Sequence, residues 1–273
     1  MQPRLGIVAG GGDLPARLVA ACRAAGREVF VLALEGHADA VAVNSAPHAW
    51  IRLGAAATGF RLLHEAGVEE VVMAGPVRRP TVQELRPDWR TARFFARLGL
   101  AALGDDGLLR AVVREFESEG FRVIGADSIL ADVVAGEGEF GRHSPDAQGW
   151  ADIRRGLEVA RRLGALDVGQ AAVVQQGIVL GVEAVEGTDA LLARCGGLRR
   201  AGPGGVLVKT AKPGQERRVD LPTIGPETVR QAEAAGLRGI AVEAGGALVV
   251  ARERVIAAAD AAGLFVIGIA DLP

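Results

Sequence analysis

The chain has 273 residues, 49% of them hydrophobic, which allows one large domain or two ordinary ones with full cores. Its 31 basic residues almost balance its 33 acidic residues, which argues against a nucleic-acid-binding protein, because such proteins normally carry a basic excess. Cys22 and Cys195 lie far apart, so neither a zinc site nor a disulfide framework is indicated, and reduced cytoplasmic thiols are expected. No apolar run approaches the roughly 18 residues of a spanning helix, so the protein is predicted to be soluble or bound at a membrane surface.

The first half alternates short apolar runs with amphipathic stretches. Strands are expected at residues 5–9, 28–34, 49–53, 70–74 and 121–125, and helices at residues 14–25, 56–66 and 106–119. Strands that alternate with helices at this spacing give βαβ units and a parallel sheet. Residues 1–135 are therefore predicted to form a Rossmann-like, doubly wound domain.

The second half follows a break in the pattern. Residues 136–146 have no hydrophobic period and carry turn residues throughout, which predicts a linker. After it we expect helices and strands at residues 147–163 (helix), 168–174 and 178–184 (a hairpin), 252–262 (helix) and 264–269 (strand). Residues 147–273 are thus predicted to be a second α/β or α+β domain.

Three consecutive glycines, Gly10, Gly11 and Gly12, form a turn between the first strand and the first helix. Sheets of this class bind phosphates at that place, on backbone N–H groups and the helix N-terminus. A dinucleotide would need the spacing GxGxxG, with Glu35 on the ribose, but Pro15 takes the place of the third glycine. Phosphate contact and a turn that serves only packing both remain open.

Only two lysines occur, Lys209 and Lys212, and every other basic residue is arginine. A compact ammonium suits close approach to a phosphate oxygen, for which the planar guanidinium is no equivalent. Asp220 follows nearby, and an ionised carboxylate suits a Mg²⁺ ligand or a group that orients water. The segment is therefore predicted to be a phosphate-and-metal site. The alternatives are a solvated loop and an exposed Asp–Lys pair of little energetic value.

Acidic residues at two further places are candidates. Thr188 is predicted to be a helix N-cap and Asp189 an acid of the first turn. Just before them, Glu183 and Glu186 cannot both face the core unpaired, so one of the two is a candidate for lining a cleft.

The adjacent Asp105 and Asp106 open another helix. Capping needs one aspartate, which leaves the other for a metal or the substrate. The histidines offer no pair at metal-ligand spacing, and there is no P-loop and no HExxH motif. Hydrolysis would have to rest on carboxylates and a metal.

A basic helix face is predicted in the segment from Arg78 to Arg97, with bulky apolar residues between its arginines. Such a face is typical of an amphipathic helix that lies on a membrane surface. The alternative is an ordinary helix with one solvated face and one core face. The arginines are Arg86, Arg90, Arg93 and Arg97, and the apolar residues are Trp89, Phe94, Phe95 and Leu98.

Several short segments occur together in a fixed order along nearly the whole chain. They are GIVAGGGDLP from Gly6, GPVRRP from Gly75, GDDGLLR from Gly104, EGF from Glu119, LDVGQ from Leu166, EAVEGTDA from Glu183, KPGQ from Lys212 and RVDLPTIG from Arg218. In their order and joint presence they resemble the LpxI-type UDP-2,3-diacylglucosamine pyrophosphatases of lipid A biosynthesis.

This resemblance implies a two-domain enzyme with the lipid product held between its domains, the second domain being catalytic. It implies Mg²⁺-dependent hydrolysis of the diphosphate to UMP and 2,3-diacylglucosamine 1-phosphate (lipid X), with water directed at the β phosphorus. The essential aspartate of the family resembles Asp220. Lys209 and Lys212 are expected to be catalytic phosphate contacts beside it.

The remaining site residues follow as hypotheses from the same resemblance and the motifs above. Substrate contacts are expected from Gly10, Gly11, Gly12, Asp13, Leu14, Arg78, Gln170, Thr188, Gln215 and Thr223. Metal contacts are expected from Asp220, Asp189, Asp105 and Asp106.

An amphiphilic substrate further implies a cytoplasmic protein attached peripherally to the inner membrane. An apolar groove for acyl chains is expected between the two halves, near the helix of residues 86–97. A homodimer is expected because twofold assemblies are the commonest for soluble enzymes. Two rival functions stay open: an NAD(P)-dependent oxidoreductase, which a nicotinamide cofactor would stabilise, and a carrier that binds the nucleotide lipid without turnover.

Overall fold

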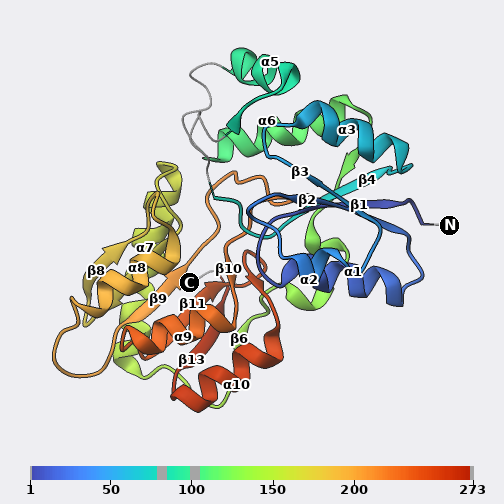
Figure 1. Cartoon of the computed structure of the whole chain (residues 1–273). Helices are drawn as coiled ribbons and strands as arrows, with labels where there is room; N and C mark the ends of the chain where they lie inside the picture. Colours follow the sequence, from blue (N-terminus) through green and yellow to red (C-terminus); the bar gives the residue numbers. More distant parts are fainter. Residues whose placement is uncertain (1, 79–84, 99–104, 271–273) are drawn as a thin grey trace. The chain divides into compact units, whose positions relative to one another are not determined.

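The protein divides into two compact units, which the computed structural model describes over residues 2–78, 85–98 and 105–270 (Figure 1). Unit 1 comprises Met1–Ala131 and Glu216–Asp220, and unit 2 comprises Asp132–Gln215 and Leu221–Pro273. Each unit contains one main sheet with helices on both faces. The predicted class of two α/β domains is therefore confirmed. None of the helices in these described ranges has the length and apolar character needed to cross a bilayer.

Unit 1 is built on a five-stranded parallel sheet in the order β3-β2-β1-β4-β5. The chain moves outward from β1 to β3 and then crosses back to β4 on the other side of β1. The order in which the chain adds strands therefore reverses between β1 and β4, although all strands stay parallel. Folds of this type bind ligands at such a switch point. The strands are β1 (Leu5–Ala9), β2 (Val29–Leu34), β3 (His48–Ile51), β4 (Glu70–Ala74) and β5 (Arg122–Val123).

Helices cover both faces of this sheet, α1 and α2 on one and α3 and α6 on the other (Figure 1). Leu18 and Val19 of α1 are buried, as are Phe60 and Leu63 of α3 and Phe116 of α6. The apolar residues of these helices thus face the strands, as expected when apolar residues recur with a period of 3.6. The helices are α1 (Leu14–Ala24), α2 (Ala40–Val43), α3 (Ala56–Glu65), α5 (Trp89–Leu98) and α6 (Asp105–Ser118).

Helix α5 begins later than the spacing of the arginines predicts. Asp88 accepts a hydrogen bond from the Thr91 N–H at 2.8 Å, and Arg86 lies before the helix with a φ of 37°. The prediction of a helix face that includes Arg86 is therefore wrong. Arg90 turns toward the protein, where it pairs with Glu115 at 3.1 Å and with Glu119. The hydrogen bond from Arg90 lowers the pKa of the Glu119 carboxyl.

A five-residue segment of the second half, Glu216–Asp220, returns to unit 1. Val219 packs against the unit 1 core, and Arg218 pairs with Glu117 at 2.7 Å and with Glu216 at 2.8 Å. The hydrogen bond from Arg218 lowers the pKa of Glu216. We call this segment the strap. It gives unit 1 a part of its core that is distant in sequence.

Unit 2 is built on a six-stranded mixed sheet in the order β6-β13-β11-β9-β7-β8. Strands β13, β11 and β9 are parallel, and β6, β7 and β8 extend the sheet by antiparallel pairing. The strands are β6 (Gly138–Glu139), β7 (Ala171–Gln175), β8 (Ile178–Val182), β9 (Val206–Lys209), β11 (Gly239–Glu243) and β13 (Phe265–Ile269), with a separate pair β10 (Thr223–Ile224) and β12 (Leu248–Val249). Strand β6 falls inside the stretch 136–146 for which the sequence predicts a linker.

Helix α7 covers one face of this sheet, and α8, α9 and α10 cover the other (Figure 1). Ile153 and Leu157 of α7 pack against Val206 and Val208 of β9. On the opposite face, Leu191 and Leu192 of α8 join the larger core cluster. The helices are α7 (Ala147–Ala165), α8 (Gly187–Gly196), α9 (Pro226–Ala234) and α10 (Arg252–Ala262).

Candidate functional site

One edge of the unit 2 sheet gathers polar side chains from four strands. Strands β9 and β11 are parallel and end with Lys209 and Glu243 at this edge. Strand β7 runs the other way and starts there, just after Gln170, while β8 ends there, just before Glu183. The carboxyl edge of the parallel strands is where open α/β sheets bind ligands. Sequence-distant residues thus meet at the place expected for a site.

Lys209 is the buried cation of this edge, with 4% of its surface exposed. Its Nζ donates to Thr188 Oγ1 at 2.8 Å and to the Thr223 carbonyl oxygen at 3.1 Å. Burying a charge is costly unless hydrogen bonds and opposite charge compensate for it. Three of the predicted site residues therefore lie together, and two of them hold the ammonium of the third.

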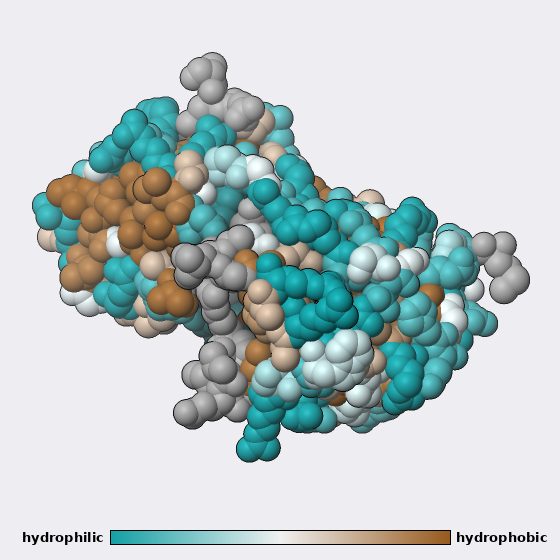
Figure 2. Space-filling model, turned by 90° about the horizontal axis from the view of Figure 1, so that it is seen from above, coloured by the Kyte–Doolittle hydropathy of each residue, from teal (hydrophilic) through white to brown (hydrophobic). Residues whose placement is uncertain are grey.

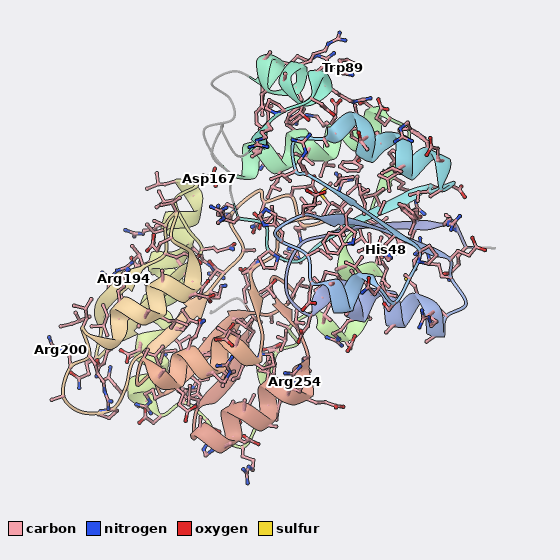
Figure 3. All side chains as sticks on the ribbon, in the orientation of Figure 1. His48, Trp89, Asp167, Arg194, Arg200 and Arg254 are labelled. Atoms are coloured by element: carbon pink, nitrogen blue, oxygen red, sulfur yellow. The ribbon has the colours of Figure 1, made fainter. Side chains whose placement is uncertain are left out.

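Lys212 lies in the turn that follows β9 and belongs to a second group of hydrogen-bonded polar residues. Its Nζ pairs with Asp167 Oδ1 at 2.8 Å, and its N–H donates to Gln215 Oε1 at 2.9 Å. Gln215 in turn donates to Gln170 Oε1 at 3.2 Å. Asp167, in the loop after α7, has a φ of 54° (Figure 3). The predicted residues Lys212, Gln215 and Gln170 are thus connected.

Thr210, between the two lysines, is a site residue that the sequence does not predict. Its side chain is fully buried, and its Oγ1 finds no hydrogen-bond partner among the described residues. Its backbone N–H donates to the Gln170 carbonyl at 3.0 Å, which places it in the same group. A buried hydroxyl without a protein partner is rare in folded proteins, and a water or a bound group can satisfy it. The only signal in the sequence was its position next to Lys209.

Thr188 lies inside α8 and is not its N-cap, which is Glu186. The predicted capping role is therefore wrong. The Thr188 hydroxyl instead donates to Glu183 Oε1 at 2.6 Å, and Glu183 is buried. Asp189 is in the first turn of α8, as predicted, and is exposed. Of the two glutamates considered in the sequence, Glu183 belongs to the polar edge and Glu186 pairs with Arg194 at 3.0 Å.

Exposed aliphatic side chains stand in the loops that carry these polar groups. Leu166 and Val168, on either side of Asp167, are 74% and 44% exposed, and Val185 is 92% exposed. The two loops touch, because a Cβ at Gly169 would lie 2.0 Å from the Glu183 carbonyl oxygen. Figure 2 shows a broad hydrophobic area on the part of unit 2 that contains α7, α8 and β8 in Figure 1. An apolar rim therefore borders the polar edge.

The carboxyl edge of the unit 1 sheet carries the glycine turn. A Cβ at Gly10 would lie 2.6 Å from the carbonyl oxygens of Gly75 and Pro76, so the turn packs directly on the loop after β4. The Gly10 N–H donates to the Ala74 carbonyl at 2.8 Å and the Gly11 N–H to the Pro76 carbonyl at 3.0 Å. These two donors serve the packing of the turn. A ligand would have to use the turn beyond them, from Gly12 to the start of α1.

The neighbouring candidates are close to this turn. Asp13 is the N-cap residue of α1 without a side-chain capping bond, and Leu14 is the first residue of the helix. The Arg78 N–H meets His37 Nδ1 at 3.3 Å, and the His37 carbonyl lies 3.2 Å from the Cβ position of Gly11. Arg78 thus follows the β4 loop at the same edge of unit 1.

Asp220 ends the strap and lies at this edge too. The Arg218 Cα approaches the Cβ position of Gly125 to 3.5 Å, so the strap runs past the carboxyl end of β5. The Asp220 N–H donates to the Glu216 carbonyl at 3.0 Å, and the residue is half-buried. Asp220 therefore belongs to unit 1, while Lys209 and Lys212 belong to unit 2.

The structure describes the side chains of two of the four metal candidates, Asp189 and Asp220. Asp105 and Asp106 open α6, and their side chains lie outside what the structure describes. Within the described residues, no three His, Cys, Asp or Glu side chains gather where they could hold a metal ion.

Comparisons with known proteins identify the family. The model of the LpxI N-terminal domain matches residues 4–133, and that of the LpxI C-terminal domain matches residues 136–267. The UDP-2,3-diacylglucosamine pyrophosphatase LpxI of Caulobacter vibrioides is 47% identical over 273 residues, covering 97% of each chain.

Likenesses to solved structures are remote. CobK precorrin-6A reductase is 14% identical, with a TM-score of 0.35 over 100% of this chain and 89% of its own. The biotin carboxylase domain of a single-chain bacterial carboxylase is 20% identical, with a TM-score of 0.25 over 64% and 38%. Scores this low bear on neither fold nor function. The two domain models, matched in order along nearly the whole chain, and the end-to-end relative show that the protein belongs to the LpxI family.

Proposed function

We propose that the protein hydrolyses UDP-2,3-diacylglucosamine to UMP and 2,3-diacylglucosamine 1-phosphate, a step of lipid A biosynthesis. The relative that carries this name matches 97% of the chain at 47% identity, and both domain models of the family are present. The structural observation that best supports the proposal is the group of buried polar residues around Lys209 and Thr210. It lies at the carboxyl edge of the unit 2 sheet.

Phosphate binding is the role that this group fits best. A diphosphate needs cations and hydrogen-bond donors that are already in place. Lys209 and Lys212 supply ammonium groups held by neighbours, and Thr210 supplies a buried hydroxyl that lacks a partner among the described residues. A phosphate oxygen bound at Thr210 Oγ1 would satisfy it.

Asp220 is proposed as the catalytic carboxylate and Mg²⁺ ligand. In phosphate-transfer sites Mg²⁺ is commonly bound by one or two carboxylates together with substrate phosphates and water. A single aspartate on the strap fits that donor set. The ion would neutralise charge on the diphosphate. Asp189, Asp105 and Asp106 remain weaker metal candidates.

The reaction is proposed as attack of water on the β phosphorus. The bond between that phosphorus and the bridging oxygen breaks, the bridging oxygen leaves with UMP, and the attacking water oxygen stays on the lipid phosphate. Asp220 orients the water, and Lys209 and Lys212 hold the phosphate oxygens as charge develops on the leaving group. Asp220 belongs to unit 1 and the lysines belong to unit 2. We therefore propose that both units contribute to the reaction, with the ligand held between them.

The acyl chains are proposed to lie on the apolar rim of Leu166, Val168 and Val185. These side chains are exposed and sit in the loops that carry Asp167 and Glu183. Burying them against lipid would recover about 25 cal/mol for each Å² removed from water. This proposal assigns the chains to unit 2, whereas the groove that the sequence suggests is near residues 86–97 of unit 1.

Helix α5 is proposed to attach the protein peripherally to the cytoplasmic face of the inner membrane. Trp89 is 68% and Phe95 38% exposed, Arg93 and Arg97 are exposed, and residues 89–98 contain no acid (Figure 3). Aromatic and basic side chains on one exposed face favour an interface with anionic lipid. The homodimer remains a proposal that sedimentation in solution tests.

The experiment that tests the function is UMP release from UDP-2,3-diacylglucosamine in detergent micelles, with Mg²⁺, with EDTA, and with Asp220→Ala in place of wild type. We expect Mg²⁺-dependent turnover that EDTA abolishes and that Asp220→Ala lowers at least about a hundredfold. In ¹⁸O-labelled water the label should appear in the lipid phosphate and not in UMP. Substrate binding without UMP release by wild type under any divalent metal would favour the carrier.

A further inference from the structure

Glu183 has no part in the reaction as described, yet it is buried at the polar edge with 6% of its surface exposed. Both of its carboxylate oxygens are used. Oε1 accepts the Thr188 hydroxyl at 2.6 Å, and Oε2 accepts the Gln170 N–H at 3.1 Å. Glu183 therefore joins the loop after β8 to the loop before β7 and to the first turn of α8.

The hydrogen bonds continue from Glu183 to Lys209. A hydroxyl has one proton to donate, and an ionised carboxylate can only accept. Thr188 gives its proton to Glu183, so the lone pairs of its Oγ1 are presented to the Lys209 Nζ at 2.8 Å. The carboxylate thus decides the direction of both hydrogen bonds. It also supplies a negative charge near an ammonium that is 4% exposed.

We propose that Glu183 is a positioning residue for Lys209 and acts through the Thr188 hydroxyl. The inference rests on the proposed pyrophosphatase function, in which Lys209 holds a phosphate oxygen. Glu183 keeps the ammonium at one place at the end of β9 while charge builds up on the diphosphate. If Glu183 only joined the loops, the loss of activity caused by its substitution would not depend on whether Lys209 is present.

Glu183→Gln is the main variant because it keeps the size of the side chain. Its amide oxygen can still accept the Gln170 N–H, but its NH₂ group donates to Thr188 and reverses the hydrogen bond there. We expect kcat and kcat/KM to fall together by about 10- to 100-fold, the range found when the partner that orients a functional side chain is removed. Thr188→Val should do the same, and Thr188→Ser should restore most of the activity.

The decisive measurement repeats Glu183→Gln in a Lys209→Gln background, by single-turnover UMP release with enzyme in excess. If Glu183 acts only through Lys209, the second substitution should cost less than about threefold more, because coupled residues are not additive. The full 10- to 100-fold loss in that background would show that Glu183 stabilises the loops and would overturn the proposal. Thr188→Val in the same background gives the same test if Glu183→Gln fails to fold.

Glu186→Gln is the matched control. Glu186 lies three residues further along the same loop and pairs with Arg194 at 3.0 Å near the surface. Its activity should equal that of wild type. If wild type itself releases no UMP, the proposed function fails, whereas an active wild type with additive losses rejects only the role of Glu183.

Discussion

At the scale of single residues, the two lysines differ from the arginines around them in what holds them. Lys209 Nζ contacts the Thr188 hydroxyl and the Thr223 carbonyl in a buried place, and Lys212 Nζ contacts the Asp167 carboxylate. These are point contacts, suited to a compact ammonium with rotatable donors. A guanidinium carries its charge further from the backbone and spreads it over a planar fork.

Lys209→Arg should therefore be far from conservative. The larger head group cannot keep the contacts with Thr188 and Thr223 in the same volume, and overpacking a buried place typically costs about 1–3 kcal/mol. We expect kcat/KM for UMP release to fall at least about tenfold, with a lower melting temperature. Arg155→Lys, an exchange in the exposed pair with Glu158, should change neither quantity. Equal activity of Lys209→Arg and wild type would contradict the point-charge role.

Which residues meet at the site could be foreseen only in part. Lys209, Lys212, Gln170, Gln215, Thr188 and Thr223 were picked from the chain, and the structure connects them. Thr210 acquires meaning only through its burial, which periodicity cannot assign to a polar residue in a loop. The sequence names Glu183 and Glu186 as alternatives, and only the burial of Glu183 decides between them. The sequence predicts the wrong N-cap for α8 because Thr188 resembles an N-cap locally, whereas in the structure its hydroxyl donates to the tertiary partner Glu183.

At the scale of elements, α5 differs from the other helices of unit 1 in how little of it is covered. Thr91 is its only buried residue, and its hydroxyl donates to the Gly54 carbonyl at 2.8 Å. Arg90, next to Thr91, forms ion pairs with Glu115 of α6 and with Glu119, the residue that follows α6. The sequence predicts the helix, but not that Arg90 turns inward, since that depends on acids 25 and 29 residues further along.

The exposed side of α5 should carry vesicle binding. A triple variant, Trp89→Ser with Arg93→Gln and Arg97→Gln, removes the aromatic anchor and two cations. Each cation near an anionic surface contributes about 1 kcal/mol, so its two arginines alone predict roughly a 30-fold weaker binding. Sedimentation with phosphatidylglycerol vesicles measures this, and activity in detergent micelles should stay unchanged.

The control for that experiment lies in the same unit. Trp50→Ser combined with Arg61→Gln removes another exposed tryptophan and a surface arginine that pairs with Glu65. This double variant should bind the vesicles as wild type does. If both variants bind equally well, α5 is not the attachment element.

At the scale of the whole molecule, the alternation of strands and helices is enough to predict two α/β units, because an alternating chain packs helices on the faces of a sheet. The sheet of unit 1 is parallel, whereas that of unit 2 is mixed. The strap was beyond that reasoning. A five-residue piece with one apolar side chain, Val219, has no period to detect. Its place is decided by the hydrophobic core of unit 1, against which Val219 packs, and by Glu117, about a hundred residues before Arg218. Composition and local pattern therefore cannot predict that this segment of the second half belongs to unit 1.

The strap should matter for the stability of unit 1 as a whole. We expect fragment 1–135 to unfold at a lower temperature than the same fragment joined to residues 214–222 by a flexible Gly/Ser linker. Packing Val219 and pairing Arg218 should contribute about 1–2 kcal/mol, which corresponds to a rise of several degrees in Tm for a chain of this size. Thermal unfolding followed by circular dichroism measures the difference.

The same fusion with Arg218→Ala and Val219→Ala serves as the control and should melt with the bare fragment. If the unaltered fusion also melts with the bare fragment, the strap does not stabilise unit 1. A stabilising strap would have a consequence for the enzyme, because Asp220 is its last residue. The carboxylate proposed for catalysis would then be held in place by the folding of unit 1, although the chain that carries it comes from the second half of the sequence.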